Sequence, residues 1–233
     1  SPISGPLILA GVMLKLGGFG IYHILMLLFK INLILNYYII SLYLLGMLVL
    51  SLLCFFQSDL KILIAYSSVV HMGLIIIALS TMNLWGYFGS LILMVGHGLC
   101  SSGLFCLSNI CYLRFKSRSI FLNKGLINIF PFLSFWWFLL YPSNMSFPPS
   151  LNLFGELFLM ISLMIWLDYM YMLYFIIMIF MFLYSLYLYL YSQYGKLFFN
   201  INYLIYVNLS EYLLLFLHWL PLNMIFLILE LFY

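Results

Sequence analysis

The chain has 233 residues, of which 67% are hydrophobic and only 6% are charged, and its formal net charge at pH 7 is +3. Its mean hydropathy is +1.22, whereas soluble domains carry about 25% charged residues, so the composition excludes a soluble globular protein. The few basic residues form no face that fits a phosphate backbone, which excludes nucleic-acid binding and leaves Lys and Arg as signals of membrane topology.

Apolar stretches of roughly 20 residues, enough to cross a bilayer, predict an all-α polytopic bundle of about seven transmembrane spans. The predicted spans cover residues 5–28, 36–56, 59–80, 84–111, 126–141 with 150–166, 170–194, and 209–231. The fifth span is expected to be broken by Pro142 and by Pro148–Pro149, because proline lacks the backbone donor and disfavours helix just before it. Asp168 is expected to mark a short turn after it.

Loop charges predict the orientation of the spans. The loops at 57–60, 112–125 and 195–208 fall on one side and carry most of the basic loop residues, namely Arg114, Lys116, Arg118, Lys124 and Lys196. The opposite loops carry Lys30 and Asp168. By the positive-inside rule the first side faces the cytoplasm or the matrix.

Lys15 lies about ten residues into the first predicted span and is followed by Gly17, Gly18 and Gly20. A charge at the bilayer centre costs from about 2.5 kcal/mol to several times that value, so such a residue is a functional hypothesis by default. We expect Lys15 to lose and regain a proton as the local field changes; the alternative is a lysine that extends to the lipid headgroups. The glycines are expected either to let neighbouring helices approach or to let this helix loosen locally.

The stretch SDLKILIAYSSVVHMG gathers further polar residues. Asp59 is expected to cap the next helix through its side-chain oxygen. Lys61 is either a proton-transfer residue or a structural residue, in an ion pair with Asp59 or as an interfacial anchor. Ser67 and His71 are four residues apart and share a helix face, so Ser67 is a candidate partner. His71 is either a satisfied core histidine or part of a proton relay.

His97 and Glu156 complete the set of candidate residues. His97 sits in GHGLCSSG, whose small residues fit a closely packed seam with room for water. Glu156 follows the proline break; unwound backbone at membrane depth is tolerated only where protein or a water-filled cavity receives it, and transporters build ion sites there. The alternative for Glu156 is an interhelical hydrogen bond without a transport role.

The sequence contains no motif for redox or metal chemistry. It contains no phosphate-binding glycine loop, no metal cluster and no nucleophile–base pair. The four cysteines, Cys54, Cys100, Cys106 and Cys111, show no metal-ligand spacing and are expected to be small core residues. We expect no signal peptide ahead of the first span. What remains is a set of protonatable groups distributed through a membrane, which suits proton transfer.

Four runs of the sequence resemble the NADH-ubiquinone oxidoreductase chain 4 family, the antiporter-like membrane subunits of mitochondrial complex I. They are SPISGPLILAGVMLKLGGFG, SDLKILIAYSSVVHMG, GHGLCSSGLFCLSNICYLRFKSRS and FPPSLNLFGE. They follow in order across about the first two thirds of the chain, and the tail after about Met170 resembles the family more loosely. The resemblance implies a proton-translocating, non-redox subunit of NADH:ubiquinone reductase in the mitochondrial inner membrane. Its implied partners are other complex I membrane subunits and lipid. It has no cofactor of its own, since NADH, FMN, iron–sulfur clusters and ubiquinone would bind elsewhere in the complex.

Carried over by position, the resemblance assigns Lys15 to the central-axis lysine, His71 and His97 to the histidines that join the axis, and Glu156 to the exit-side glutamate. It also implies one membrane domain over 1–233. Within it, residues 5–28 would be the last helix of a first repeat, 36–194 a second five-helix repeat and 209–231 a C-terminal span. The first half of the family is expected outside this chain, either in a longer form of it or on another chain.

Two alternatives from other classes stay open at this point. The chain resembles, less closely, subunits of multisubunit cation/proton antiporters, in which ion exchange is not coupled to redox chemistry. It is otherwise an inert membrane scaffold, whose polar residues only hold helices together.

Overall fold

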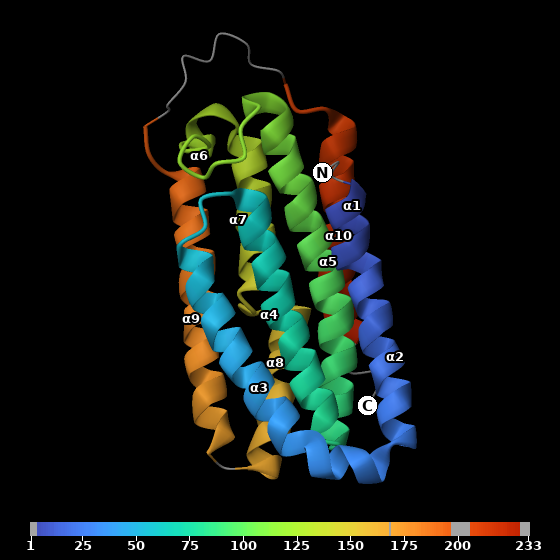
Figure 1. Cartoon of the computed structure of the whole chain (residues 1–233). Helices are drawn as coiled ribbons and strands as arrows, with labels where there is room; N and C mark the ends of the chain where they lie inside the picture. Colours follow the sequence, from blue (N-terminus) through green and yellow to red (C-terminus); the bar gives the residue numbers. More distant parts are fainter. Residues whose placement is uncertain (1–3, 168, 197–205, 229–233) are drawn as a thin grey trace.

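The computed structural model describes residues 4–167, 169–196 and 206–228, and Figure 1 shows the arrangement of its helices. Within these residues every regular element is helical, apart from one isolated bridge between Asp59 and Ser119. The helices stand side by side in an elongated bundle that the chain crosses back and forth (Figure 1). The all-α prediction is therefore confirmed.

Five of the predicted spans are single long helices or rods. The first consists of α1 (Ser4–Ile8), a π-helical turn η1 (Leu9–Met13) and α2 (Leu14–Leu27), and it is followed by α3 (Phe29–Phe55), α4 (Leu60–Ser80), α5 (Leu84–Phe115) and, later, α9 (Met170–Gln193). By length and composition these five are able to cross a membrane. The shorter α10 (Leu209–Ile228) accounts for the last predicted span as far as residue 228. Asp168 and residues 229–231 lie outside the described residues.

The remaining span is broken, as the prolines predict. After the short α6 (Leu126–Ile129), α7 (Pro131–Asn144) starts at the α6 end of the bundle, and α8 (Leu151–Trp166) ends at the opposite end (Figure 1). The break covers residues 145–150 and contains Pro148–Pro149. The expectation that Pro142 interrupts the helix is wrong, because Pro142 lies inside α7. A proline in the last turn removes one main-chain hydrogen bond and leaves the preceding turns intact.

Two other predicted boundaries also differ from the structure. Helix α3 begins at Phe29 rather than 36, so that Leu28 alone separates it from α2 and Lys30 is helical. The amide of Leu28 bonds to Ile24 O and Leu28 O accepts from Asn32 N, which carries the helical bonding across the corner. Helix α5 continues to Phe115, four residues beyond the predicted end, and stops where Lys116 takes a left-handed conformation (φ 53°).

The connections fall at the two ends of the bundle as the loop analysis predicts. The turn between α3 and α4, the α6 region, the end of α9 and the start of α10 lie at one end, and the α2–α3, α4–α5 and α8–α9 connections lie at the other (Figure 1). Which end faces the cytoplasm or the matrix stays a prediction.

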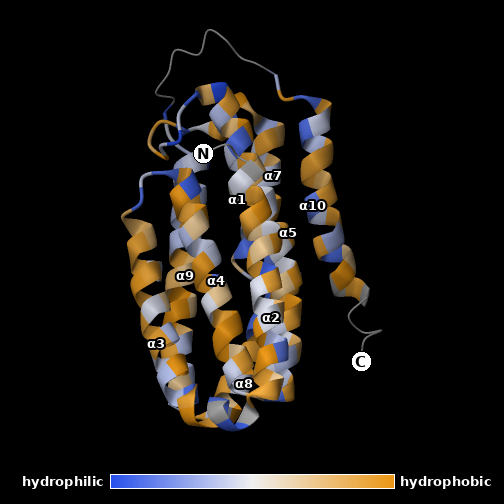
Figure 2. Cartoon of the chain, turned by 45° about the vertical axis from the view of Figure 1, so that its right-hand side comes forward, coloured by the Kyte–Doolittle hydropathy of each residue, from blue (hydrophilic) through white to orange (hydrophobic). Residues whose placement is uncertain are grey.

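The outside of the bundle is apolar and part of its inside is polar. Hydrophobic residues predominate along the helices (Figure 2), and large apolar side chains such as Tyr38 and Phe132 are more than 70% exposed. In contrast, α4 and α5 bury serines and histidines in the interior. The four cysteines are free and buried, as expected of core residues. This distribution fits a bundle whose surroundings are lipid, in which only the interior satisfies polar groups.

Helix α8 lies against α5 at two glycines. A methyl group added at Gly155 would meet the backbone nitrogen of Leu93 at 3.1 Å, and one added at Gly89 would meet the carbonyl oxygen of Gly155 at 3.1 Å. Such contacts are tighter than ordinary packing distances, so glycine permits this approach of the two backbones. The glycines after Lys15 stay α-helical, and the loosened turn is η1, ahead of them.

Candidate functional site

Four predicted site residues form one line of contacts through the interior. Lys15 Nζ lies 3.0 Å from His97 Nδ1. The ring centroids of His97 and His71 are 4.7 Å apart, and His71 Nδ1 lies 3.5 Å from Glu156 Oε1. Because the four residues come from α2, α5, α4 and α8, the line joins helices that are far apart in the sequence.

The line runs across the bundle rather than along it. An α-helix rises about 1.5 Å per residue, so Lys15 lies roughly 18 Å from the end of α2 and His71 roughly 14 Å from the end of α4. By the same measure His97 lies roughly 20 Å from the start of α5, and Glu156 roughly 15 Å from the end of α8. These four helix ends share one end of the bundle (Figure 1). The four groups therefore lie at a similar depth near the middle of their spans.

The π-helical turn η1 supplies an acceptor to Lys15. The amide of Leu14 bonds to Leu9 O, five residues back, instead of to Ala10 O. Ala10 O accepts a hydrogen bond from Lys15 Nζ at 2.6 Å. The lysine head group is thus held between a backbone carbonyl and His97, and does not extend to the headgroup region. The headgroup alternative for Lys15 does not fit this geometry.

The two histidines are fully buried and keep free ring nitrogens. Both have a relative exposure of 0%, and within the described residues both nitrogens of His71 and Nε2 of His97 lack a hydrogen-bond partner. The expected Ser67–His71 pairing is wrong. Ser67 Oγ donates to Ile64 O at 2.7 Å, the usual local bond of a serine inside a helix. His71 is therefore not a histidine satisfied by its own helix.

Glu156 sits one turn after the start of α8, next to the break. It is 4% exposed, and neither carboxylate oxygen has a hydrogen-bond partner among the described residues. The Tyr174 hydroxyl donates to the backbone carbonyl of Glu156 at 2.9 Å. One turn earlier, Asn152 Nδ2 donates to Ser143 O at 2.8 Å, so α8 is tied to the end of α7. The break places polar groups inside the bundle, where protein can receive its unwound backbone.

The structure does not bring Lys61 into this line. Its ammonium lies 5.2 Å from the ring centroid of Tyr112 and has no hydrogen-bond partner among the described residues. Asp59 does not cap α4 through its side chain, which makes that expectation wrong. Its backbone is extended and is held in a bridge with the 118–120 segment, where Leu60 N donates to Arg118 O at 3.0 Å and Ile120 N donates to Ser58 O at 2.8 Å.

Sequence reasoning missed an ion pair between the ends of two helices. Arg114, at the end of α5, contacts the Glu211 carboxylate through both terminal nitrogens, with Nη1 at 3.2 Å from Oε1. Glu211 also accepts from Asn208 N at 3.0 Å. The available signal was the presence of opposite charges at two helix ends predicted on the same side. This pair fastens α10 to α5.

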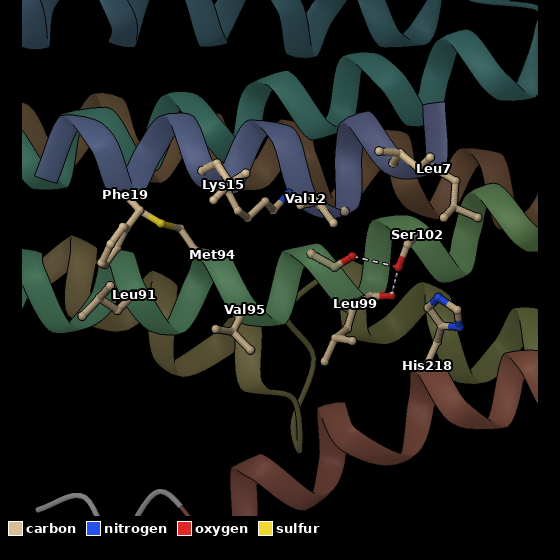
Figure 3. A pocket seen from close by; sticks show the side chains of 14 residues that line it. Leu7, Val12, Lys15, Phe19, Leu91, Met94, Val95, Leu99, Ser102 and His218 are labelled. Atoms are coloured by element: carbon tan, nitrogen blue, oxygen red, sulfur yellow. Dashed lines mark hydrogen bonds between the residues drawn. The ribbon is translucent and has the colours of Figure 1, made fainter. Parts of the chain in front are cut away.

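A second missed feature is a cavity of about 710 Å³ beside Lys15. Figure 3 shows Lys15 and His218 at its wall, on opposite sides of the α5 residues that include Ser102. His218 Nδ1 is 2.8 Å from Leu214 O in its own helix. Among the described residues, no group of three His, Cys, Asp or Glu side chains is arranged to hold a metal ion.

Comparison with known proteins places these residues in a family. Residues 1–183 match the family described as "NADH:quinone oxidoreductase/Mrp antiporter, TM". The chain is 52% identical over 233 residues to NADH-ubiquinone oxidoreductase chain 4 of Locusta migratoria, which covers 100% of this chain and 52% of that protein. It is 51% identical over 184 residues to the protein of the same name from Anopheles arabiensis, with coverage of 79% and 83%. The chain spans about half the length of the first of these relatives.

Solved structures show the same fold. A chain of respiratory complex I from Thermus thermophilus with bound NADH superposes with a TM-score of 0.77 at 21% identity, over 84% of this chain and 42% of that chain. A chain of the Mrp complex from Dietzia sp. DQ12-45-1b superposes with a TM-score of 0.76 at 17% identity, over 82% and 36%. The bundle, its broken span and the identities to the insect proteins agree: the chain belongs to the NADH-ubiquinone oxidoreductase chain 4 family.

Proposed function

We propose that the chain is part of a proton-translocating membrane subunit of respiratory complex I in the mitochondrial inner membrane. Protons move along Lys15, His97, His71 and Glu156, driven by electron transfer from NADH to ubiquinone elsewhere in the complex. The observation that carries the proposal is the line of contacts that joins four protonatable groups from four helices, of which His97, His71 and Glu156 are buried and Lys15 is half-buried. Buried ionisable groups inside a membrane bundle are costly and are typical of proton relays.

The contacts suggest how each group acts. Lys15 Nζ is within direct proton-transfer distance of His97 Nδ1, at 3.0 Å, since proton transfer needs roughly 2.6–3.2 Å or one bridging water. An imidazole takes a proton at one nitrogen and releases one from the other, so each histidine passes a proton through its ring. The unpartnered ring nitrogens of His97 and His71 leave places for a bridging water between them.

Glu156 ends the line on the α8 side. Its Oε1 lies 3.5 Å from His71 Nδ1, slightly beyond direct transfer, so a small approach of the two side chains or one water completes the step. No cofactor takes part in these steps. The implied partners are the other complex I membrane subunits, which supply the redox-driven conformational change, and the lipid around the apolar flanks.

The antiporter alternative has weaker support. The insect relatives at 48–52% identity carry the NADH-ubiquinone oxidoreductase name, whereas the likeness to the Mrp complex stands at 17% identity and concerns the fold. The discriminating observation is the energy source. Proton movement that persists without NADH oxidation and follows a sodium or potassium gradient would favour the antiporter function.

The proposal is tested by Glu156→Gln in the full-length subunit within the assembled complex. Glutamine keeps the shape and hydrogen-bonding capacity of the side chain but cannot exchange a proton at neutral pH. We expect fewer protons pumped per NADH oxidised in proteoliposomes, with the amount of assembled complex unchanged. Asp59→Asn serves as the matched control, since Asp59 lies outside the line. Normal stoichiometry in assembled Glu156→Gln would instead support the inert scaffold.

A further inference from the structure

A separate cavity of about 370 Å³ lies between α8 and α9. Its volume falls within the range of small-molecule sites, roughly 300–1,000 Å³. Its wall is almost entirely apolar and includes Tyr174, Met178 and Phe182 of α9. Glu156 and Ser146 line it from the α8 side and from the break. The cavity therefore combines a small-molecule volume with one acidic group.

Glu156 is the feature that gives this cavity a chemical preference. The side chain is 96% buried, and both carboxylate oxygens lack a hydrogen-bond partner within the described residues. The Ser146 hydroxyl lies beside this carboxylate at the cavity wall, in a position to donate a hydrogen bond to it. A buried carboxylate without partners is strongly stabilised by a cation that donates hydrogen bonds to it. The nearest candidate cation is His71 of α4, at 3.5 Å, and His71 does not line the cavity.

The mouth of the cavity faces the outside of the bundle. Phe175, Ile179 and Leu183 line it and are 53%, 45% and 44% exposed. They are spaced by four residues, so they form one face of α9. A molecule that enters here comes from the apolar phase. The aromatic rings of Phe175 and Phe182 at the wall also suit a cation, because ring faces attract positive charge.

We propose that this cavity binds a small lipophilic ammonium cation, with its N–H groups on the Glu156 carboxylate and its apolar tail between α8 and α9. Charge complementarity selects the head group, and the apolar wall selects the tail. A neutral molecule of the same shape would leave the carboxylate without a counter-charge. Binding does not rest on the proposed function, because an ammonium ion occupies the site whether or not the chain moves protons. Inhibition of pumping by the bound amine would rest on it.

The test uses covalent labelling of Glu156 in membranes that hold the full-length protein in its complex. Dicyclohexylcarbodiimide takes the carboxyl proton on one nitrogen while the carboxyl oxygen adds to its central carbon. Acyl transfer to nitrogen then leaves an N-acylurea that retains every atom of the reagent. Peptide mass spectrometry reads the adduct at Glu156. We expect 4-phenylbutylammonium to slow this labelling by about tenfold or more, the size of a charge-assisted hydrogen bond.

Two controls show whether protection depends on the charge of the amine rather than its shape, and on the cavity rather than on partition into the membrane. The neutral 4-phenylbutanol should slow labelling by less than about twofold, since it lacks the charge. Met178→Trp should fill the cavity and remove the effect of the amine, whereas Met172→Trp, on an exposed part of the same helix, should leave it intact. Equal protection by the alcohol, or no adduct at Glu156, would overturn the proposal.

A direct binding measurement tests the site without relying on the labelling reaction or on the tryptophan variants. Radiolabelled 4-phenylbutylammonium should bind the wild-type complex, and Glu156→Gln should weaken that binding by about tenfold or more. Undiminished binding to Glu156→Gln refutes the site. A Glu156→Gln complex that pumps protons normally but no longer binds the amine would refute the proposed function and support the binding site.

Discussion

Replacing Gly155 by alanine should separate α8 from α5 and lengthen the contact between Glu156 and His71. The added methyl would meet Leu93 Cβ at 3.0 Å, its backbone nitrogen at 3.1 Å and its Cα at 3.2 Å. Non-bonded carbon atoms prefer about 3.5–4.0 Å, so the helices must part by roughly 0.3–0.8 Å, because a backbone does not move aside as a side chain does. His71 belongs to α4, which packs mainly on α5 and much less on α8. When α8 moves away, the distance of 3.5 Å between His71 Nδ1 and Glu156 Oε1 therefore grows to about 4 Å.

Two magnitudes follow from this displacement. Overpacking of a well-packed contact costs about 1–3 kcal/mol, which should lower the melting temperature of the subunit within the complex. A misplacement of 1 Å costs up to about 100-fold in rate, so roughly half that distance predicts a loss of up to about tenfold in proton transfer.

The assay is proton pumping per NADH oxidised in proteoliposomes, with thermal unfolding of the same preparation. Gly46→Ala is the matched control, because a methyl there has no neighbour within 4 Å. It should change neither quantity. If Gly155→Ala pumps and unfolds like the wild type, the helices are not held at the distance that the structure shows, and the reasoning from the α5–α8 contact fails.

Three further predictions concern the lysines and the ion pair. Lys15→Gln and Lys15→Arg should both reduce pumping with assembly retained, since glutamine carries no proton to transfer and arginine does not release one; pumping by Lys15→Arg at the wild-type level would show that only positive charge is needed. Arg114→Met should destabilise the docking of α10 by about 1–3 kcal/mol, because the Glu211 carboxylate loses its counter-charge; the change should appear as faster proteolysis near residue 208. Arg114→Met with Glu211→Met should be less destabilised than Arg114→Met alone, and an equal effect would exclude the ion pair as the cause. Lys61→Met should lower thermal stability by about 0.5–2 kcal/mol through its lost contact with the Tyr112 ring while leaving pumping near normal; a large pumping defect would return Lys61 to the proton path.

The spans were predictable because apolar length alone decides which segments cross a bilayer. The break at Pro148–Pro149 was predictable because two missing amide donors leave no continuous helix. Pro142 shows the limit of this rule, since only its place in the last turn of α7 decides that the helix survives. The corner at Leu28 carried no glycine or proline, so no local signal marked the start of α3.

The four site residues were identifiable as ionisable groups in apolar helices, but their order was not. That His97 lies between Lys15 and His71 depends on how α2, α4 and α5 pack, which involves residues distant in sequence. The Ser67–His71 expectation failed because a helical serine has a carbonyl of its own turn within reach. Asp59 failed as a cap because its backbone pairs with a loop about 60 residues away.

The first span, formed by α1, η1 and α2, should tolerate the deletion of one residue within the π-helical turn η1 better than the same deletion elsewhere. A π-turn accommodates one extra residue in an otherwise α-helical run, so deleting one residue within Leu9–Met13 would restore the ordinary ladder and keep the flanking faces aligned. That deletion would return an amide to Ala10 O and compete with Lys15 for its acceptor. A deletion within α2 would instead turn one flank by about 100° against the other. A one-residue deletion in η1 thus changes the hydrogen bonding of one carbonyl, whereas the same deletion in α2 changes the packing of a whole helix.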